Sequence, residues 1–331
     1  MRAMVLERQA PCEENPLVLR ELPVPEPADD EVLVRVEACG VCHTDLHIVE
    51  GELPPHRLPL ILGHQIVGRV VACGPKVTGI SPGERVGTPW LFSVCGECSF
   101  CRRGRENLCS KARFTGYDVD GGYAEYFLAR KDSVYPLPEG YESPEVAPLL
   151  CGGVIGYRAY RATETQKGDI LALFGFGSSA HLVLQMGLYE GKEIFVFTRS
   201  PHHRELARKL GASFVGGAED DPPSPFHAAI VFAPSGFLIR RALEHLAPGG
   251  KVVAAGIYAT PIPEIPYELL YRERVIQSVA NSTRQDVREL LEMAGRYRFR
   301  IFCEIYPLEE ANEVLKKLKN GQVQASAVLV P

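Results

Sequence analysis

The sequence predicts an α/β protein of two domains, one rich in β-strands and one built on a doubly wound parallel sheet. The chain has 331 residues, more than the roughly 100–200 that usually share one hydrophobic core. Its first 150 residues carry short β-branched runs broken by Gly and Pro. Residues 170–258 instead alternate buried-strand patterns with helical ones, which is typical of a parallel sheet with crossover helices.

Individual elements follow from these patterns. In the first region, EVLVRVEA (31–38) and QIVGRVVACG (65–74) are expected as strands. In the second region, apolar runs predict strands and the runs between them predict helices. The expected strands are 170–176, 193–198, 228–233 and 251–258, and the expected helices are 178–191, 201–212 and 238–250. An amphipathic stretch at 286–297, a helix at 308–321 and an apolar run at 326–330 follow.

Composition excludes several classes of protein. Hydrophobic residues make up 46% and charged residues 23% of the chain, which is ordinary for a globular protein. A net charge of −5 argues against nucleic acid as a partner, because phosphate binding needs a concentrated basic face. The start of the chain lacks a signal-peptide core, and no run approaches the ~20 apolar residues of a membrane span. A cytoplasmic location is therefore expected, where cysteines serve as ligands or buried residues.

The segment CGECSFCRRGRENLC contains a cluster of four cysteines. Thiolates spaced in this way can surround one Zn²⁺ tetrahedrally, because each C-x-x-C turn places two sulfurs on the same side. Such a site leaves no position for water or substrate, which predicts a structural role. Four unrelated buried cysteines are the alternative, and two additional thiols disfavour a redox pair. The predicted ligands are Cys95, Cys98, Cys101 and Cys109.

A second, open metal site is expected from residues that are distant in the sequence. A catalytic zinc needs three protein ligands and one free position. Cys42 in CGVCHTDLH, His64 in LILGHQIVG and Cys151 in APLLCGGVIGYRA each lie near glycines that allow sharp turns. Each residue alone could equally be an ordinary buried side chain, so the hypothesis rests on the combination.

The order of these motifs resembles the zinc-dependent alcohol dehydrogenases of the medium-chain dehydrogenase/reductase superfamily. CGVCHTD, GH, the four clustered cysteines, a cysteine before two glycines and a nucleotide-binding turn follow one another over essentially the whole chain. The resemblance implies a GroES-like catalytic domain at 1–152 and 285–331, and a Rossmann coenzyme domain at 153–284. It also implies catalytic zinc on Cys42, His64 and Cys151, and structural zinc on the four clustered cysteines.

The resemblance further implies a proton relay. Zn²⁺ lowers the pKa of a coordinated alcohol toward neutrality, which favours release of hydride. Thr44 would take the alcohol proton, and His47 would receive it by way of the nicotinamide ribose. Asp45 would accept a hydrogen bond from His64 and improve it as a ligand, while His43 would donate to the cofactor phosphates. Alternatively, Thr44 and Asp45 serve only to cap a helix, and His47 is an ordinary surface residue.

A dinucleotide-binding turn of the form G-x-G-x-x-A lies between the expected strand 170–176 and the helix that follows it. The glycines permit the turn and let a pyrophosphate approach the backbone at the helix N-terminus. A tight turn without a ligand is the alternative. The turn residues are Gly175, Phe176, Gly177, Ser178, Ser179 and Ala180.

The end of the next expected strand indicates which nicotinamide cofactor is bound. An NAD enzyme would carry Asp or Glu there, whereas this chain has Thr198, Arg199 and Ser200. An arginine and two hydroxyls suit a 2′-phosphate, so NADP is expected over NAD, with His203 and Arg204 as further donors. In the alternative interpretation, Arg199 simply points into solvent.

Three further residues bear on the family comparison. Gln65 follows His64 where relatives commonly have Glu, and Ser326 aligns with a basic residue that many relatives place against the pyrophosphate. Trp90 corresponds to an aromatic wall of the substrate pocket, although an ordinary core position is equally open. Cys12, Cys39, Cys73 and Cys303 are expected as buried apolar residues without a role in the site.

The predicted function is oxidation of a primary alcohol or reduction of an aldehyde by hydride transfer with NAD(P). The resemblance also suggests a homotetramer or homodimer joined through the edge strands of the nucleotide-binding sheets. A polyol or sugar dehydrogenase is the first alternative, which Gln65 and Trp90 disfavour. A non-catalytic, zinc-stabilised binding protein is the second. Such a protein has no need of the open site that Cys42, His64, Cys151 and Thr44 imply.

Overall fold

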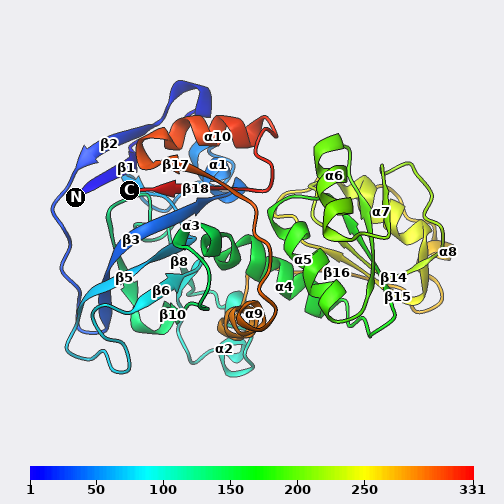
Figure 1. The fold of residues 1–331 in the computed structure, drawn as a ribbon, viewed down its shortest axis with the longest axis horizontal. Coiled ribbons are helices and arrows are strands. Elements are labelled where there is room, and N and C mark those ends of the chain that lie inside the picture. The colour runs from blue at the N-terminus through cyan, green and yellow to red at the C-terminus, as the bar shows by residue number, and fades with distance from the viewer. The chain divides into compact units, whose positions relative to one another are not determined.

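The computed structural model describes residues 1–331, and the chain divides into two units. Unit 1 comprises Met1–Cys151 and Asn281–Pro331, and unit 2 comprises Gly152–Ala280. The colours of Figure 1 show that both ends of the chain, blue to cyan and orange to red, belong to unit 1. The chain therefore leaves unit 1, builds unit 2 without interruption and returns.

Unit 1 contains one seven-stranded sheet and two smaller ones. In the large sheet the path is β10-β6-β5-β3-β18-β17, and β9 also pairs with β3. Its strands are β3 (Glu31–Val41), β5 (Ile66–Cys73), β6 (Arg85–Thr88), β9 (Tyr126–Arg130), β10 (Tyr135–Pro136), β17 (Cys303–Pro307) and β18 (Ser326–Val330). The smaller sheets contain β1 (Arg2–Leu6), β2 (Leu17–Glu21) and β4 (Leu60–Ile61), and β7 (Leu91–Ser93) with β8 (Arg113–Phe114).

The strand β18 occupies an interior place in this sheet, although it lies at the end of the sequence. It pairs antiparallel with β3, with Val328 opposite Gly40, and parallel with β17. Its side chains from Ser326 to Leu329 are buried, which agrees with the continuous apolar run in the sequence. The last residues of the chain are thus part of the core of unit 1.

Helices of unit 1 connect and cover its strands. The α-helices are α1 (His43–Glu50), α2 (Ser99–Arg102), α3 (Ser143–Val146), α9 (Arg284–Tyr297) and α10 (Ala311–Lys319). The 3₁₀ turns are η1 (Cys12–Glu14), η2 (Glu106–Leu108), η3 (Lys131–Ser133), η4 (Ala147–Leu150) and η5 (Leu308–Glu310). Helix α9 begins after Thr283, which forms a capping box with Asp286.

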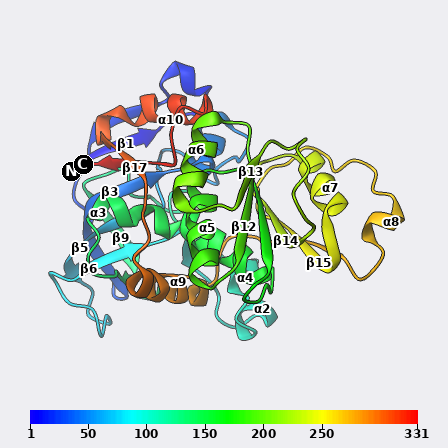
Figure 2. The same ribbon diagram turned by 45° about the vertical axis from the view of Figure 1, so that its right-hand side comes forward.

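Unit 2 is a six-stranded parallel sheet with the strand order β13-β12-β11-β14-β15-β16. This is the doubly wound order, and it confirms the predicted parallel sheet. The strands are β11 (Ile170–Phe174), β12 (Glu193–Phe197), β13 (Phe214–Gly216), β14 (Phe226–Val231), β15 (Leu246–Ala254) and β16 (Val275–Ser278). Helices cover both faces of the sheet, with α5 and α6 on one side and α7 on the other (Figure 2).

The helices of unit 2 are α4 (Gly152–Ala162), α5 (Ser178–Tyr189), α6 (Pro201–Leu210), α7 (Gly236–Glu244) and α8 (Tyr267–Leu270). The helix expected at 238–250 ends at Glu244, because Leu246 already pairs with Phe226 in the sheet. Stacked rings of Phe174 and Phe197, with centroids 4.4 Å apart, fill the core beside β11. No helix in the structure combines the length and the apolar character needed to cross a membrane.

Candidate metal centres and cofactor turn

The four clustered cysteines converge around one point in unit 1. The sulfurs of Cys98 and Cys101 are 3.5 Å apart, those of Cys95 and Cys109 are 3.6 Å apart, and those of Cys95 and Cys101 are 3.8 Å apart. A tetrahedron with Zn–S bonds of about 2.3 Å has edges of about 3.8 Å. All four thiols are free and much too far apart for disulfide bonds. The spacing of the four sulfurs therefore fits a single ion.

The chemistry of this cluster also fits a cation. Backbone amides of Glu97 and Cys98 donate to the sulfur of Cys95 and lower its pKa to about 6. Thiolate is thus the favoured form at neutral pH, and thiolate is the form that binds Zn²⁺. We call the segment 95–112 the cysteine lobe. Its only regular elements are α2 and η2, so a bound ion would provide much of its stability.

Cys42, His64 and Cys151 also come together in unit 1. The sulfur of Cys42 lies 3.2 Å from Nε2 of His64 and 4.0 Å from the sulfur of Cys151. All three ligand atoms lie within 4.8 Å of one another. Two sulfurs and one imidazole nitrogen match the donor set of an open zinc site, and a fourth position remains for a substrate. We call these three residues the open site.

The local fold explains how the first two side chains reach the open site. Cys42 directly follows β3 and caps α1, where its sulfur accepts a hydrogen bond from Thr44 N at 3.3 Å. Gly63, with φ of +95°, turns the chain immediately before His64. A Cβ atom at Gly63 would lie 2.4 Å from Cδ1 of Tyr123, so only glycine fits there.

Asp45 closes the N-terminal cap of α1 and also lies against His64. Its Oδ2 accepts a hydrogen bond from Cys42 N at 2.9 Å, which completes the capping box of α1. Its Oδ1 lies 3.3 Å from Nδ1 of His64, so the carboxylate also fixes the imidazole ring. Asp45 is 0% exposed and His64 is 1% exposed. One buried carboxylate therefore both caps α1 and lies next to the ring of His64.

The electrostatics of the open site favour a cation. Burial alone lowers the pKa of His64, but the charges of Cys42 and Asp45 raise it to about 10. A hydrogen bond from Cys151 lowers the pKa of Cys42, and the same bond raises the pKa of Cys151. Buried thiolate and carboxylate groups need positive charge nearby. The donor set and its charge therefore fit Zn²⁺.

The predicted relay residues lie along α1. Thr44 and His47 are half-buried and three residues apart, which places them on neighbouring positions of one helix face. His43 is exposed at the start of the helix. The Nδ1 atom of His47 pairs with the carboxylate of Glu52, which the sequence analysis missed. The acidic residue directly after the end of α1 was the available signal.

Trp90 faces the open site and is also packed into an aromatic stack. Its ring lies 4.9 Å from that of His64 at an interplanar angle of 77°. It stacks on Phe114 at 5.0 Å and on Tyr117 at 5.8 Å. Trp90 is therefore packed among aromatic rings while it also faces His64, and the stack fixes its orientation. Phe114 and Tyr117 were not predicted, because their proximity to Trp90 depends on the β7–β8 pairing.

The remaining positions from the family comparison are both buried. Gln65 is 3% exposed, and a Cβ atom at Gly40 would lie 2.6 Å from its Oε1. Its side chain thus packs closely over the backbone of β3. Ser326 is 5% exposed and opens β18, where it pairs with Cys303.

The cysteines outside the two clusters differ in burial. Cys12 and Cys39 are fully buried, as expected, whereas Cys73 and Cys303 are only half-buried because they lie at the ends of β5 and β17. Burial raises the pKa of Cys12 to about 11. Lys319 lies beside Cys12 and contacts Glu13 at 2.9 Å and Glu50 at 2.7 Å. Cys12, Glu13 and Glu50 form a third group of potential metal ligands, and the ammonium of Lys319 already supplies positive charge there.

In unit 2, the G-x-G-x-x-A sequence forms the turn between β11 and α5. Gly175 has φ of +90°, and Gly177 caps α5. A Cβ atom at Gly177 would meet nothing within 4 Å, which leaves open space for a phosphate beside the backbone. Ser178 and Ser179 form the first turn, and Phe176 and Ala180 are buried. The turn therefore fits a dinucleotide at the N-terminus of α5.

The residues expected at the adenosine ribose lie between β12 and α6. Arg199 is exposed, while Thr198 is 8% exposed. Two of the candidate donors also serve local structure. The Nε atom of Arg204 donates to the carbonyl of Thr198 at 2.8 Å, and the hydroxyl of Ser200 accepts from His203 N at 3.3 Å.

A buried histidine in α5 was not singled out from the sequence. His181 is 0% exposed, and its Nδ1 lies 3.2 Å from the carbonyl oxygen of Gly177. Burial lowers the pKa of His181 to about 4, so its ring is neutral at physiological pH. Its place one residue after the glycine motif was the signal that could have marked it.

An open metal site of two thiols and an imidazole, together with a doubly wound sheet and a glycine-rich turn, defines a metal-dependent nicotinamide oxidoreductase. Comparison with known proteins gives the family. Residues 28–139 match the model of the alcohol dehydrogenase GroES-like domain. Residues 180–296 match that of the zinc-binding dehydrogenase family.

Two similar proteins span nearly the full chain. AdhA of Mycobacterium tuberculosis (strain CDC 1551 / Oshkosh), which carries the name of an alcohol dehydrogenase, is 45% identical over 100% of this chain and 97% of its own. An alcohol dehydrogenase of Geobacillus stearothermophilus is 36% identical over 99% of both chains. The chain therefore belongs to the zinc-dependent alcohol dehydrogenases of the medium-chain dehydrogenase/reductase superfamily.

Solved structures show the same fold. Acetophenone reductase from Geotrichum candidum NBRC 4597, in complex with NAD, has a TM-score of 0.88 at 26% identity, covering 100% of this chain and 97% of its own. A protein from Sinorhizobium meliloti 1021 described as a zinc-binding dehydrogenase, bound to NADP, has a TM-score of 0.88 at 26% identity, covering 100% and 99%. The architecture is thus a GroES-like domain with a Rossmann domain, and the enzyme uses zinc and a nicotinamide cofactor.

Proposed function

We propose that the enzyme transfers hydride between a primary alcohol or aldehyde and nicotinamide at the open site formed by Cys42, His64 and Cys151. The convergence of these three side chains is the observation that carries the proposal, because a protein without catalysis has no need of an incomplete ligand set. When bound, zinc supplies Lewis-acid charge that favours loss of the alcohol proton.

The chain's own residues would orient the substrate and move its proton. Thr44 accepts the proton, and His47, one turn further along α1, releases it toward solvent. Asp45 holds the ring of His64 in a fixed orientation. His43 binds the cofactor phosphates. Trp90 forms an apolar wall that favours simple alcohols over polyols.

A substrate panel tests this proposal against the two alternatives. Nicotinamide absorbance would be followed with primary alcohols, aldehydes and polyols, on wild type and on Thr44→Val. Turnover of simple alcohols or aldehydes that is lost in Thr44→Val supports the proposal. Faster turnover of polyols would favour a polyol dehydrogenase, and no turnover with any substrate would favour a binding protein.

We further propose two zinc ions per chain, one in the open site and one in the cysteine lobe. Both donor sets meet the distance requirements described above. Metal analysis of the purified protein should give two ions per chain, and Cys42→Ser should retain one. A single ion in the wild type would contradict this proposal.

For the cofactor, we propose a preference for NADP over NAD. The residues that follow β12, where the adenosine ribose would bind, are Thr198, Arg199 and Ser200. Arg199 is exposed, the other two residues carry hydroxyls, and no carboxylate follows β12 directly. Arg199→Asp should shift the ratio of kcat/KM values toward NAD, whereas Arg208→Asp, an exposed arginine of α6, should leave the ratio unchanged. An unchanged ratio in Arg199→Asp would overturn the assignment.

The zinc chemistry is assigned to the expected domain 1–152 and 285–331, and dinucleotide binding is assigned to the expected domain 153–284.

We also propose a homodimer or homotetramer joined through β16. This edge strand contains exposed Val275 and lies near exposed Tyr267 and Tyr271. Light scattering should show the oligomer, and Val275→Lys should weaken it. The cytoplasmic location remains a prediction.

A further inference from the structure

The cysteine lobe is connected to the rest of unit 1 by a buried carboxylate that the proposed chemistry does not use. Glu106 begins η2, between the third and fourth cysteines of the lobe, and is only 8% exposed. Its Oε1 accepts a hydrogen bond from the backbone N–H of Arg284 at 2.8 Å. Arg284 is the first residue of α9, so the lobe provides an acceptor for an amide that has no partner within the helix.

This contact involves the point at which the chain returns from unit 2. Residues 281–283 lead directly into α9, and Thr283 with Asp286 caps the same helix end. The negative charges of Glu106 and Asp286 both lie at the positive end of the helix dipole, which is the favourable arrangement. The start of α9 is therefore held by two contacts, the hydrogen bond to Glu106 of the lobe and the local cap of Thr283 and Asp286.

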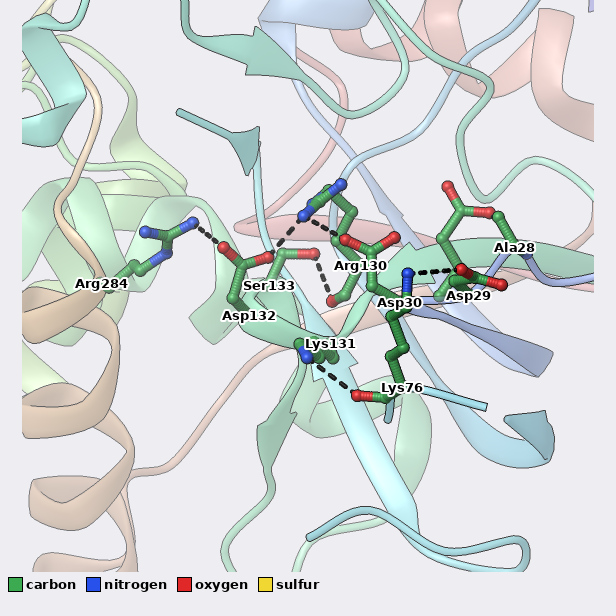
Figure 3. A network of polar contacts seen from close by, with 10 residues as sticks. Ala28, Asp29, Asp30, Lys76, Arg130, Lys131, Asp132, Ser133 and Arg284 are labelled. Carbon is green, nitrogen blue, oxygen red and sulfur yellow. Dashed lines mark hydrogen bonds and ion pairs between the residues drawn. The ribbon is translucent and has the colours of Figure 1, made fainter. Parts of the chain in front are cut away.

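A chain of ion pairs extends from the same residue on the surface (Figure 3). Nη2 of Arg284 contacts Oδ2 of Asp132 at 2.5 Å, and Arg130 contacts Asp132 at 3.4 Å and Asp30 at 2.5 Å. The side chain of Asp132 is 43% exposed. Exposed pairs of this kind contribute little, so the buried bond to Glu106 is the stronger of the two attachments of Arg284.

Helix α9 in turn contacts both ends of the segment that carries Cys151. At the start of that segment, the hydroxyl of Tyr141 donates to the carbonyl of Ala294 at 3.1 Å, and Arg298 donates to the carbonyl of Gly140 at 2.6 Å. At its end, α9 packs against η4, whose residues are all buried and immediately precede Cys151. Displacement of α9 would therefore move the backbone that presents this thiol.

We propose that Glu106 is a positioning residue that couples the two metal centres: by fixing α9, it lets an ordered cysteine lobe place Cys151 in the open site. The inference rests on the proposed function, since it takes both clusters as zinc sites. The lobe then acts on the open site through one helix, without contributing a ligand to it.

Hydrogen exchange in the metal-loaded full-length protein tests the first link. Glu106→Ala should speed exchange at the start of α9 by about tenfold or more, because a buried amide loses a charged acceptor. Glu106→Gln keeps an oxygen acceptor and should restore most of the protection. Glu97→Ala provides the matched control, since Glu97 lies in the same lobe but its side chain is exposed and pairs only weakly with Lys111 at 3.7 Å. Arg284→Ala, which keeps the backbone N–H, should have an effect below about fivefold.

A spectroscopic experiment tests the second link. With zinc in the lobe and cobalt in the open site, the thiolate-to-cobalt absorption reports the geometry of Cys42 and Cys151. Glu106→Ala should alter this spectrum and speed exchange across residues 147–151, while Glu106→Gln and Glu97→Ala should resemble wild type. This readout separates positioning from a general loss of stability, which would not change the spectrum of the remaining folded protein.

Distinct results would overturn the proposal. Unchanged exchange of α9 in Glu106→Ala would remove the first link. A loosened α9 with an unchanged cobalt spectrum and unchanged exchange at 147–151 would remove the second link and confine Glu106 to holding α9. A wild type that binds no metal would overturn the proposed function as well, and metal analysis would reveal this before any variant is made.

Discussion

The two cysteine clusters of unit 1 are assembled in opposite ways. The ligands of the cysteine lobe lie within residues 95–109 and are supported by two short elements. The open site draws Cys42, His64 and Cys151 from three separated segments, and His64 is buried together with Asp45. A local cluster depends on its ion for order, whereas a dispersed cluster depends on the fold to exist. We therefore expect a bound metal to stabilise the fold of the lobe. In the open site, we expect the surrounding fold to keep the ligands in place for the metal.

The largest effect is expected from removing a ligand of the open site. Cys42→Ser should lower kcat/KM by more than about a thousandfold, because substrate loses the positive charge that the reaction requires. The free energy of unfolding should change much less, since the surrounding sheet supplies the fold. Steady-state kinetics, metal analysis and chemical denaturation on the same preparation provide the measurement. A fully active Cys42→Ser enzyme would contradict the assignment of this residue.

The same substitution in the lobe should show the reverse pattern. Cys98→Ser should lower the free energy of unfolding by at least about 3 kcal/mol, because a lobe with so little regular structure loses its ion. The folded fraction should lose some activity, because a disordered lobe no longer fixes α9 and Cys151, but it should keep much more activity than Cys42→Ser. Denaturation curves and kinetics for the two variants, compared side by side, test the contrast. If both variants lose activity and stability to the same extent, the two clusters do not differ as described.

A smaller effect is expected from the carboxylate behind His64. Asp45→Asn should weaken zinc binding at the open site by about 10–100-fold, because the imidazole loses its charged partner. Binding at the lobe should not change. Competition with a chelator measures both sites. Asp120→Asn is a suitable control, because Asp120 is an exposed residue of unit 1 that pairs with Arg57.

The smallest effect concerns the pH dependence of stability and involves His181, which is not a proposed metal ligand. The measurement must separate this effect from the loss of stability that follows acid release of metal. The pKa of His181 falls from 6.5 to about 4 in the folded protein. The unfolded state therefore binds more protons between these values, so the penalty is absent above about pH 6.5 and grows as pH falls toward 4. It should amount to about 1–2 kcal/mol at pH 5. His181→Gln should flatten this part of the stability curve.

The control for that measurement is His202→Gln, since His202 is exposed on α6 in the same unit. Its stability curve between pH 7 and pH 5 should keep the slope of the wild type. Metal release from the two clusters occurs equally in both variants, so the difference between their curves isolates His181. Equal slopes in all three proteins would show that this histidine does not contribute.

Much of the architecture could be predicted from the sequence because its signals are local. The alternation of strand-like and helix-like runs predicted the parallel sheet of unit 2, and the spacing of the cysteines predicted the lobe. Glu106, Phe114 and Tyr117 were missed for a common reason: each acts through a neighbour that tertiary structure brings to it, such as the Arg284 amide beside Glu106. Lys319 was missed in the same way, because its partners Glu13 and Glu50 lie near the other end of the chain.

Some alternatives were ambiguous in the sequence because one side chain has two functions. Asp45 caps α1 and also orients His64, so the choice between these roles had no single answer. Trp90 is both packed and directed at the open site. The helix expected at 238–250 was too long because pairing of Leu246 in the sheet outweighs local helical preference.

The interior position of β18 has a consequence for biosynthesis. Residues 152–280 leave the ribosome as one continuous stretch, so unit 2 can fold while translation is still under way. The strand that closes the gap between β3 and β17 is made long after β3. Until then the end of β3 at Cys39–Val41 lacks the partner strand β18, whereas β9 pairs with the start of β3. The nascent chain therefore passes through a period in which the end of β3 that leads into Cys42 presents unpaired amides and carbonyls.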